Sequence, residues 1–187
     1  SRKSLIISLV GGVICDMGGY ISATYMRGIE FIQVPTSLLA QVDASVGGKV
    51  AINHPKCKNM IGSFKSPYRV LIDVEFLKTL AEREFKSGMG ELLKYSFLTK
   101  DKKYLEYVKN NVEKIKALDN EVLENIVEQS IRIKKHYVDI DPFEKGERAF
   151  LNLGHTYAHA LESFFAYKAY THGEAVAKGI IFDLELS

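Results

Sequence analysis

The sequence predicts an α/β amino-terminal part followed by an all-helical remainder. Two apolar, β-branched runs, Leu5–Val10 and Ile29–Val34, enclose a glycine turn and a helical pattern. That order is typical of a parallel strand–helix–strand unit. From about residue 80 onward, apolar residues recur mostly at helical spacing. We therefore expect an α/β domain over residues 1–80 and a helical domain over residues 81–187.

Local signals place the elements of the α/β part. Gly28 is a helix stop, and Thr36-Ser37 can cap the helix that follows. Gly47-Gly48 stands between β-formers and predicts the bend of a hairpin. In chain order we expect a helix from Asp16 to Gly28, a short helix at Leu38–Asp43, a hairpin at Ala44–Asn53, a loop at His54–Pro67 and a strand at Arg69–Asp73.

The second part reads as a series of amphipathic helices. Lysines dominate the exposed side of one of them, which we expect to lie on the surface. Asp141-Pro142 ends the longest helix. In chain order we expect helices at Ala81–Leu98, Asp101–Leu118 and Asn120–Tyr137, a loop at Phe143–Glu147, a helix that carries two histidines, and a helix at Gly173–Leu186.

Composition narrows the class of protein. Apolar residues make up 47% of the chain and charged residues 26%, the balance of an ordinary globular protein. The formal net charge of +2 gives no reason to expect nucleic acid or an anionic membrane as partner. No apolar run reaches the roughly 20 residues of a membrane span. Two cysteines, Cys15 and Cys57, without metal-binding spacing favour a reducing cytoplasm.

Histidines mark the most distinctive stretch. His155 and His159 are four residues apart, so a helix would place both rings on one face. His172 precedes the last helical pattern, and Glu91 is a carboxylate in an otherwise apolar helix. Nitrogen and oxygen donors of this kind suit a divalent metal. A histidine pair at this spacing also occurs by chance, so the pattern alone leaves both readings open.

Glycine-rich turns offer two candidate phosphate sites. Gly11-Gly12 lies between a strand and a helix that begins near Asp16, where a helix N-terminus favours negative charge. Lys49 follows Gly47-Gly48, and a lysine beside glycine amides can bind a phosphate oxygen. Lys58 in the next loop has the same potential. A plain tight turn and a solvated hairpin tip are the alternatives.

Charged residues in the helical part suggest where an anionic ligand would bind. Glu91 and Lys94 share a helix face, either as a surface salt bridge or as a partly buried pair that needs a cation. Arg148 and Asn152 precede His155 by seven and three residues, which predicts a similar helix face. With Lys134 they could donate hydrogen bonds to an anion. The alternative is a capping arginine at a surface helix start.

Several motifs occur together in the order and spacing of the 3-dehydroquinate synthases. These motifs are Pro35-Thr-Ser-Leu-Leu-Ala-Gln-Val-Asp43-Ala-Ser-Val-Gly-Gly-Lys49, Lys58-Asn59-Met-Ile-Gly-Ser-Phe64, Leu77-Lys-Thr79-Leu-Ala-Glu-Arg83-Glu84-Phe85, Gly88-x-x-Glu91-x-x-Lys94, Arg148-Ala-Phe-Leu-Asn152-Leu-Gly-His155-Thr156 and His172-Gly-Glu-Ala-Val176. The chain therefore resembles that sugar phosphate cyclase family over nearly its whole length. Since family members exceed 300 residues, the resemblance implies a central fragment.

The resemblance implies a lyase of the shikimate pathway that depends on NAD and on Zn²⁺ or Co²⁺. Such an enzyme converts 3-deoxy-arabino-heptulosonate 7-phosphate to 3-dehydroquinate and phosphate, and the first domain would be an incomplete, Rossmann-like NAD-binding domain. The family's metal ligands correspond to Glu91, His155 and His172. Its substrate-binding and catalytic positions fall on Arg27, Asp43, Asn59, Lys94, Lys134, Arg148, Asn152 and His159, with Lys49 shared. Its NAD-binding positions fall on Gly11, Gly12, Asp16, Thr36, Ser37, Lys49, Lys58 and Thr79, with Glu84 near them.

Departures from the family pattern concern the cofactor more than the metal. Val10 and Cys15 stand where glycine is usual in the first turn, and Val50-Ala51 replaces Thr-Gly. Lys178 replaces an apolar residue in the last helix. Another sugar phosphate cyclase, a polyol dehydrogenase that uses metal and NAD, and a fragment that binds without turnover are the alternative functions. The resemblance also implies a cytoplasmic homodimer and weak turnover by the fragment alone.

Overall fold

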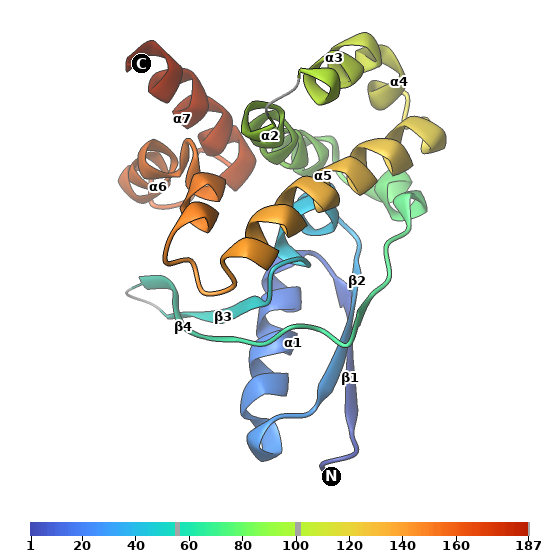
Figure 1. The fold of residues 1–187 in the computed structure, drawn as a ribbon, viewed down its shortest axis with the longest axis vertical. Coiled ribbons are helices and arrows are strands. Elements are labelled where there is room, and N and C mark those ends of the chain that lie inside the picture. The colour runs from blue at the N-terminus through green and yellow to red at the C-terminus, as the bar shows by residue number, and fades with distance from the viewer. Residues whose placement is uncertain (55–56, 100–101, 187) are drawn as a thin grey trace.

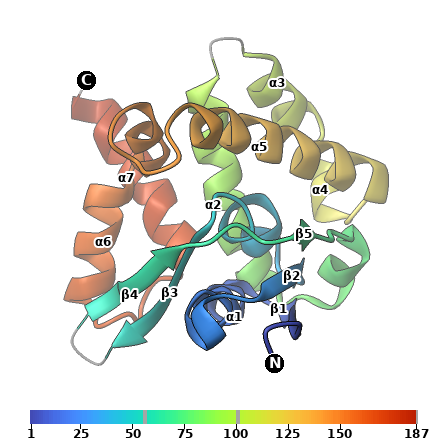
Figure 2. The same cartoon turned by 60° about the horizontal axis from the view of Figure 1, so that its bottom comes forward.

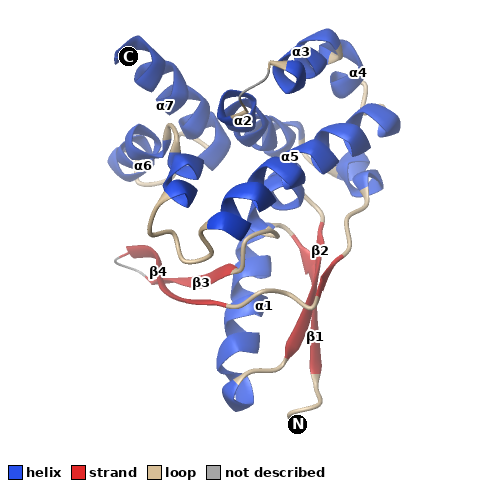
Figure 3. Ribbon diagram, in the orientation of Figure 1, coloured by secondary structure: helices blue, strands red, loops and turns tan. Residues whose placement is uncertain are grey.

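A computed structural model describes residues 1–54, 57–99 and 102–186. The strands and helix α1 form one end of the molecule, and helices α2 to α7 form the other (Figures 1 and 3). The predicted fold class, an α/β part followed by helices, is confirmed. The division into domains at residue 80 remains a prediction.

A three-stranded parallel sheet organises the amino-terminal end. Its strands lie in the order β1 (Leu5–Val10), β2 (Glu30–Pro35), β5 (Arg69–Val70). Helix α1 (Gly12–Thr24) connects β1 to β2, which confirms the predicted strand–helix–strand unit. The helix begins four residues before the predicted Asp16, because Gly11 is its extended N-cap and the strand passes directly into the helix.

The predicted hairpin is wrong in its position. Strand β3 (Lys49–His54) pairs antiparallel with β4 (Cys57–Phe64), so most of the predicted loop 54–67 is a strand. Gly47 and Gly48, expected at the tip, precede β3 with φ of +108° and +66°. Residues before them cannot form the other arm of a hairpin, since Ala40–Ala44 already forms the wide π-helical turn η2.

Two short 3-10 helices flank this region. After α1 comes η1 (Tyr25–Arg27), and after β5 comes η3 (Val74–Thr79). The predicted strand Arg69–Asp73 shortens to two residues, because the Asp73 carboxylate accepts a hydrogen bond from the Glu75 N–H at 2.9 Å and so caps η3. The short helix predicted after Thr36-Ser37 is present.

The helical end differs from expectation at two breaks. The single helix predicted for 101–118 is two helices, α3 (Lys103–Asn110) and α4 (Val112–Lys116), because Asn111 between them donates its side-chain amide to the Tyr107 carbonyl at 2.8 Å. Asp101 itself lies outside the described residues. Likewise η4 (Glu147–Asn152) and α6 are separate, since Gly154 has φ +78°. The remaining helices are α2 (Glu82–Leu98), α5 (Asn120–Ile140), α6 (His155–Phe164) and α7 (His172–Leu186).

One core joins the two ends of the molecule. Helix α2 runs through the middle of the helical end (Figure 2) and buries Leu92 and Tyr95. Ile126 of α5 packs into the same cluster, as does Val42 of η2. The turn that carries Asp43 is therefore held against α2 and α5. None of the described helices combines the length and apolar character that crossing a bilayer requires.

Helices α2 and α7 make an unusually close contact through glycine. A Cβ atom added to Gly173 would lie 1.7 Å from the Ser87 carbonyl oxygen, and one added to Gly90 would lie 2.1 Å from the Gly173 carbonyl oxygen. The contact sets Glu91 of α2 next to His172 of α7. A side chain at this point would force the helices apart.

We expect Gly173→Ala to lower the free energy of unfolding by about 1–3 kcal/mol, the usual cost of overpacking. The measurement is urea unfolding followed by circular dichroism. Glu185→Ala, on the exposed surface of α7, is the matched control and should stay within about 0.5 kcal/mol of the parent. Equal stability of the two variants would contradict the close contact.

Candidate active site

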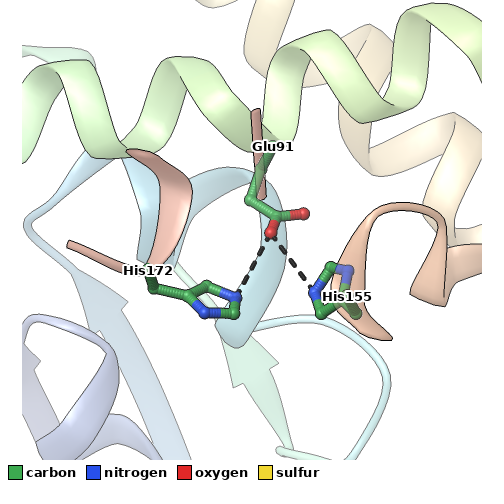
Figure 4. Close-up of side chains that lie close together, drawn as sticks. All are labelled: Glu91, His155 and His172. Carbon is green, nitrogen blue, oxygen red and sulfur yellow. Dashed lines mark ion pairs between the residues drawn. The ribbon is translucent and has the colours of Figure 1, made fainter. Parts of the chain in front are cut away.

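Glu91, His155 and His172 converge on one point (Figure 4). One Glu91 oxygen, Oε1, lies 3.6 Å from Nε2 of His155 and 3.4 Å from Nε2 of His172. Glu91 is fully buried, its Oε2 forms an ion pair with the Lys94 ammonium, and its Oε1 faces the two histidine nitrogens. A buried carboxylate needs compensating positive charge, which Lys94 supplies to Oε2 and a metal ion could supply to Oε1. The donor set, whose ligand atoms lie within 4.8 Å of one another, fits Zn²⁺ or Co²⁺.

Each histidine is oriented by a different group. Nδ1 of His155 faces the Leu153 carbonyl at 3.1 Å, and Nδ1 of His172 faces Glu162 Oε1 at 3.3 Å. Burial lowers the pKa of His155. Burial acts in the same direction on His172, but hydrogen bonds to Glu162 and Glu91 outweigh it and raise the pKa to about 9. A divalent cation would compete for the nitrogen that holds this proton.

A buried ion cluster adjoins the histidines. Lys94 pairs with Glu91 Oε2 and lies 3.6 Å from Asp43 Oδ1, which Lys134 approaches at 2.9 Å. The Tyr95 hydroxyl donates to the same Asp43 oxygen at 2.7 Å. Burial favours the neutral form of Asp43, yet the charges of Lys134 and Lys94 hold its pKa well below the usual range. Asp43 is thus the shared counter-ion of two buried lysines.

A cavity of about 450 Å³ connects the ion cluster with the α/β part. His159 and His172 line it from the helical end, and the side chain of His159 is 60% exposed. The structure therefore brings together many of the predicted substrate and cofactor residues. Those that line the cavity are Gly12, Asp16, Asp43, Lys58, Asn59, His159 and His172. Their functional roles remain predictions.

The environment of Asp16 in this cavity disfavours its negative charge. Burial, followed by the charge of Asp43, raises its pKa from 3.8 to about 7. Since the folded pKa is above the unfolded one, the ionised carboxylate destabilises the fold. This loss of folding stability is absent below about pH 4, grows as the pH rises and reaches its full size above about pH 7.

We expect Asp16→Asn to stabilise the protein by about 2 kcal/mol at pH 8 and hardly at all at pH 4. Partial exposure of Asp16 lets solvent screen its charge, which limits the gain. Urea midpoints at the two pH values measure the difference. Glu30→Gln, an exposed acid on β2, is the control. A gain for Asp16→Asn that does not grow with pH would contradict the assignment.

The side chains of Arg148 and Asn152 hydrogen-bond to loop residues, and they are not on the same helix as His155. Arg148 donates to the carbonyls of Gly47 at 2.8 Å and Pro142 at 2.6 Å. Asn152 donates to Glu144 at 2.7 Å. The predicted shared face is wrong, because Leu153 and Gly154 interrupt the helix. Arg148 instead fixes the glycine turn before β3.

Lys49 completes this loop. Its ammonium forms an ion pair with Glu144, the residue that also accepts from Asn152. Burial, together with the charge of Arg148, lowers the pKa of Lys49 to about 8. Lys49 also lines a second cavity of about 450 Å³ that shares Asp16 and Asn59 with the first. The loop is therefore contiguous with the candidate site.

Other predicted positions lie apart from this cluster. Arg27 is exposed at the end of α1 opposite to Asp16, and Thr79 and Glu84 are exposed at the end of η3 and the start of α2.

Near the N-terminus of α1, the Ser37 hydroxyl accepts the Ala40 N–H at 3.3 Å. Gly11 and Thr36 lie in the same turn region, where the Thr36 N–H donates to the Val10 carbonyl at 3.0 Å.

Three residues of the site escaped the sequence analysis: Tyr95, Glu144 and Glu162. Glu162 stands three residues after His159 and seven after His155, so its place on the same helix face was a usable signal. Tyr95 lies four residues after Glu91. For Glu144 no local pattern exists, because its partners Lys49 and Asn152 meet it only in the folded loop.

Comparison with known proteins gives the family. The chain is 94% identical over 187 residues to the bifunctional 3-dehydroquinate synthase/phosphatase of Fusobacterium nucleatum subsp. nucleatum, covering 28% of that protein. It is 51% identical over 186 residues to the 3-dehydroquinate synthase of Halalkalibacterium halodurans, covering 51% of it. These matches cover the whole chain. The chain thus spans about half, or less, of the length of these relatives.

A solved structure shares the fold. It is 2-deoxy-scyllo-inosose synthase complexed with carbaglucose-6-phosphate, NAD⁺ and Co²⁺, with a TM-score of 0.87 and 29% identity over 99% of this chain and 51% of that one. Family models described as 3-dehydroquinate synthase N-terminal and C-terminal match residues 1–87 and 88–187. As the second covers more than half of the sequence, the chain belongs to the 3-dehydroquinate synthase family.

Proposed function

We propose that the natural protein carrying this chain is a 3-dehydroquinate synthase. It converts 3-deoxy-arabino-heptulosonate 7-phosphate to 3-dehydroquinate and phosphate, with NAD and Zn²⁺ or Co²⁺. One observation carries the proposal: Glu91 faces two histidines with one oxygen and the buried Lys94 with the other. A metal-ligand set and a cationic cluster for an anion thus share one carboxylate.

Charge in this cluster favours an anionic substrate. Lys94 and Lys134 contribute +2, and Asp43 and Glu91 contribute −2, so the four groups sum to zero. A divalent ion held by Glu91, His155 and His172 would leave a net charge of +2. A phosphate or carboxylate bound beside the lysines would neutralise it in a setting where water screens little.

The chain's residues have distinct tasks in this proposal. When bound, the metal supplies Lewis-acid polarisation of a hydroxyl, and NAD supplies a reversible hydride acceptor. Lys94 and Lys134 hold the anionic groups, while Asp43 keeps both lysines in place. His159 borders the cavity and is placed to hydrogen-bond the substrate or to relay a proton. Asp16 on α1 and Lys58 on β4 line the same cavity, where we place the cofactor, and Asn59 lines it as a substrate-binding position.

Two alternative enzymes differ in measurable ways. A related cyclase would release phosphate from another sugar phosphate, as expected from the fold shared with 2-deoxy-scyllo-inosose synthase. A polyol dehydrogenase would accumulate NADH, whereas the synthase reoxidises it within each turnover. The buried lysine pair argues against a neutral polyol, which needs no cationic cradle.

The test is phosphate release by the natural polypeptide. We expect release from the heptulosonate phosphate with NAD and Zn²⁺, its loss in a chelator, and its return when Zn²⁺ or Co²⁺ is added back. No net NADH should appear. Absence of release with both cofactors present would refute the proposal, and release from glucose 6-phosphate instead would favour the related cyclase. From these 187 residues alone we expect weak or no turnover.

Location and assembly belong to the same proposal. We expect a cytoplasmic homodimer that binds a small phosphorylated sugar acid. The buried, free thiol of Cys15, whose pKa burial raises to about 11, suits a reducing compartment. Light scattering of the purified protein measures the oligomeric state.

A further inference from the structure

Glu162 is a buried carboxylate with partners on three elements. It lies on α6 and is 3% exposed. Its Oε2 faces Nδ1 of His159 at 2.9 Å, and its Oε1 faces Nδ1 of His172 at 3.3 Å and Nζ of Lys58 at 3.2 Å. Helices α6 and α7 and strand β4 therefore meet at a single side chain.

The contact with His172 determines which ring nitrogen faces Glu91. An ionised carboxylate only accepts hydrogen bonds, so Nδ1 of His172 carries a proton and donates it to Glu162. The other nitrogen, Nε2, is then the one directed at Glu91, at 3.4 Å. For His155 the corresponding partner is the nearby Leu153 carbonyl. His172 thus depends on a side chain from another helix for its orientation.

The contact with Lys58 reaches the hairpin. Lys58 belongs to β4, and its ammonium also lies 5.5 Å from the centre of the Tyr167 ring. Asn59, its neighbour on β4, lines the cavity together with His172. Glu162 therefore connects the strand pair on one wall of the cavity with the histidine on the other.

A second metal ion is the competing explanation, because ligand atoms of His159, Glu162 and His172 also lie within 4.8 Å of one another. The Lys58 ammonium at 3.2 Å from Glu162 argues against it. It already supplies the positive charge that the carboxylate needs, and it would repel a cation at that position.

We infer that Glu162 is a positioning residue, which directs Nε2 of His172 into the proposed metal-ligand set and, through Lys58, holds the β3–β4 hairpin against it. The inference rests on the proposed function, because it takes His172 as a ligand. Partners of this kind fix ring orientation and tautomer, and their loss commonly weakens metal binding 10- to 100-fold, as an order of magnitude.

The test uses Co²⁺ with the natural polypeptide and its Glu162→Gln and Glu162→Ala variants. Proton NMR of the Co²⁺ form should show two shifted, exchangeable signals from the Nδ1–H groups of His155 and His172. We expect both variants to lose the His172 signal to solvent exchange, to keep the His155 signal, and to bind Co²⁺ about 10- to 100-fold more weakly. Glu185→Gln, exposed on α7, should leave signals and affinity unchanged.

Hairpin amides provide a second readout. Hydrogen exchange in β3 and β4 should accelerate in Glu162→Gln and in Lys58→Met, while Lys58→Met keeps both exchangeable proton signals. Unchanged Co²⁺ affinity and signals in both Glu162 variants would overturn the inference alone, as would two bound Co²⁺ ions per chain in the parent. No Co²⁺ binding by the parent would overturn the proposed metal site as well.

Discussion

Replacing Glu91 with glutamine should abolish metal-dependent activity and weaken Zn²⁺ binding by at least about 100-fold. This substitution removes the charge of a proposed ligand itself, which should weaken metal binding more than the loss of a residue next to a ligand. Glutamine has nearly the same shape as glutamate, so packing against α7 should survive. Competition with a chelator of known affinity measures the dissociation constant for Zn²⁺, and phosphate release measures the activity.

A control on the same helix separates this effect from a general loss of negative charge. Glu82 is exposed in the first turn of α2 and pairs with Lys86. Glu82→Gln should bind Zn²⁺ and release phosphate like the parent. If Glu91→Gln keeps the metal affinity of the parent, Glu91 is not a ligand and the carboxylate serves Lys94 alone.

Replacing Asp43 with asparagine should lower the free energy of unfolding by about 3–5 kcal/mol, the usual result of breaking a buried ion pair. Lys134 would lose the Asp43 carboxylate that it contacts at 2.9 Å, and Lys94 would keep its ion pair with Glu91. Tyr95 would lose the anionic acceptor of its hydroxyl. Urea unfolding at neutral pH measures the loss.

A double substitution tests the cause. Removing the lysine charge as well, in Asp43→Asn with Lys134→Met, should recover part of the stability, since the uncompensated buried charge is gone. Asp139→Asn, which breaks the exposed pair with Lys135, should cost less than about 1 kcal/mol. A loss for Asp43→Asn no larger than for Asp139→Asn would contradict the buried cluster.

Local sequence patterns predicted the elements that can be recognised from their own residues, without knowledge of the strand or helix that they pack against. The predicted strands Leu5–Val10 and Ile29–Val34 correspond to β1 and, one residue later in the chain, to β2, because both runs are rich in apolar and β-branched residues and are bounded by glycine or proline. The hairpin was misplaced because the glycines at 47 and 48 signal a bend without saying which strand lies on either side. The partner strand of the hairpin is β4, which was predicted as a loop because Lys58 and Asn59 are polar.

Some residues of the candidate site could be predicted from the sequence and others could not. Family resemblance pointed to Glu91, His155 and His172 as metal ligands, and the fold brings these three side chains together. Their role as ligands stays a prediction. Helical spacing alone suggested that His155 and His159 act as a pair, but His159 faces Glu162 instead. Glu144 was beyond reach of any local pattern, because both of its partners reach it only through loop packing.

The distances along the chain between partners have a consequence for synthesis on the ribosome. The Lys134–Asp43 contact spans 91 residues, Arg148–Gly47 spans 101 and Lys58–Glu162 spans 104. Closing such long loops is slow compared with forming a helix. Until His172 has left the exit tunnel, the nascent chain holds only part of the donor set. Metal acquisition should therefore follow the emergence of α7 from the tunnel.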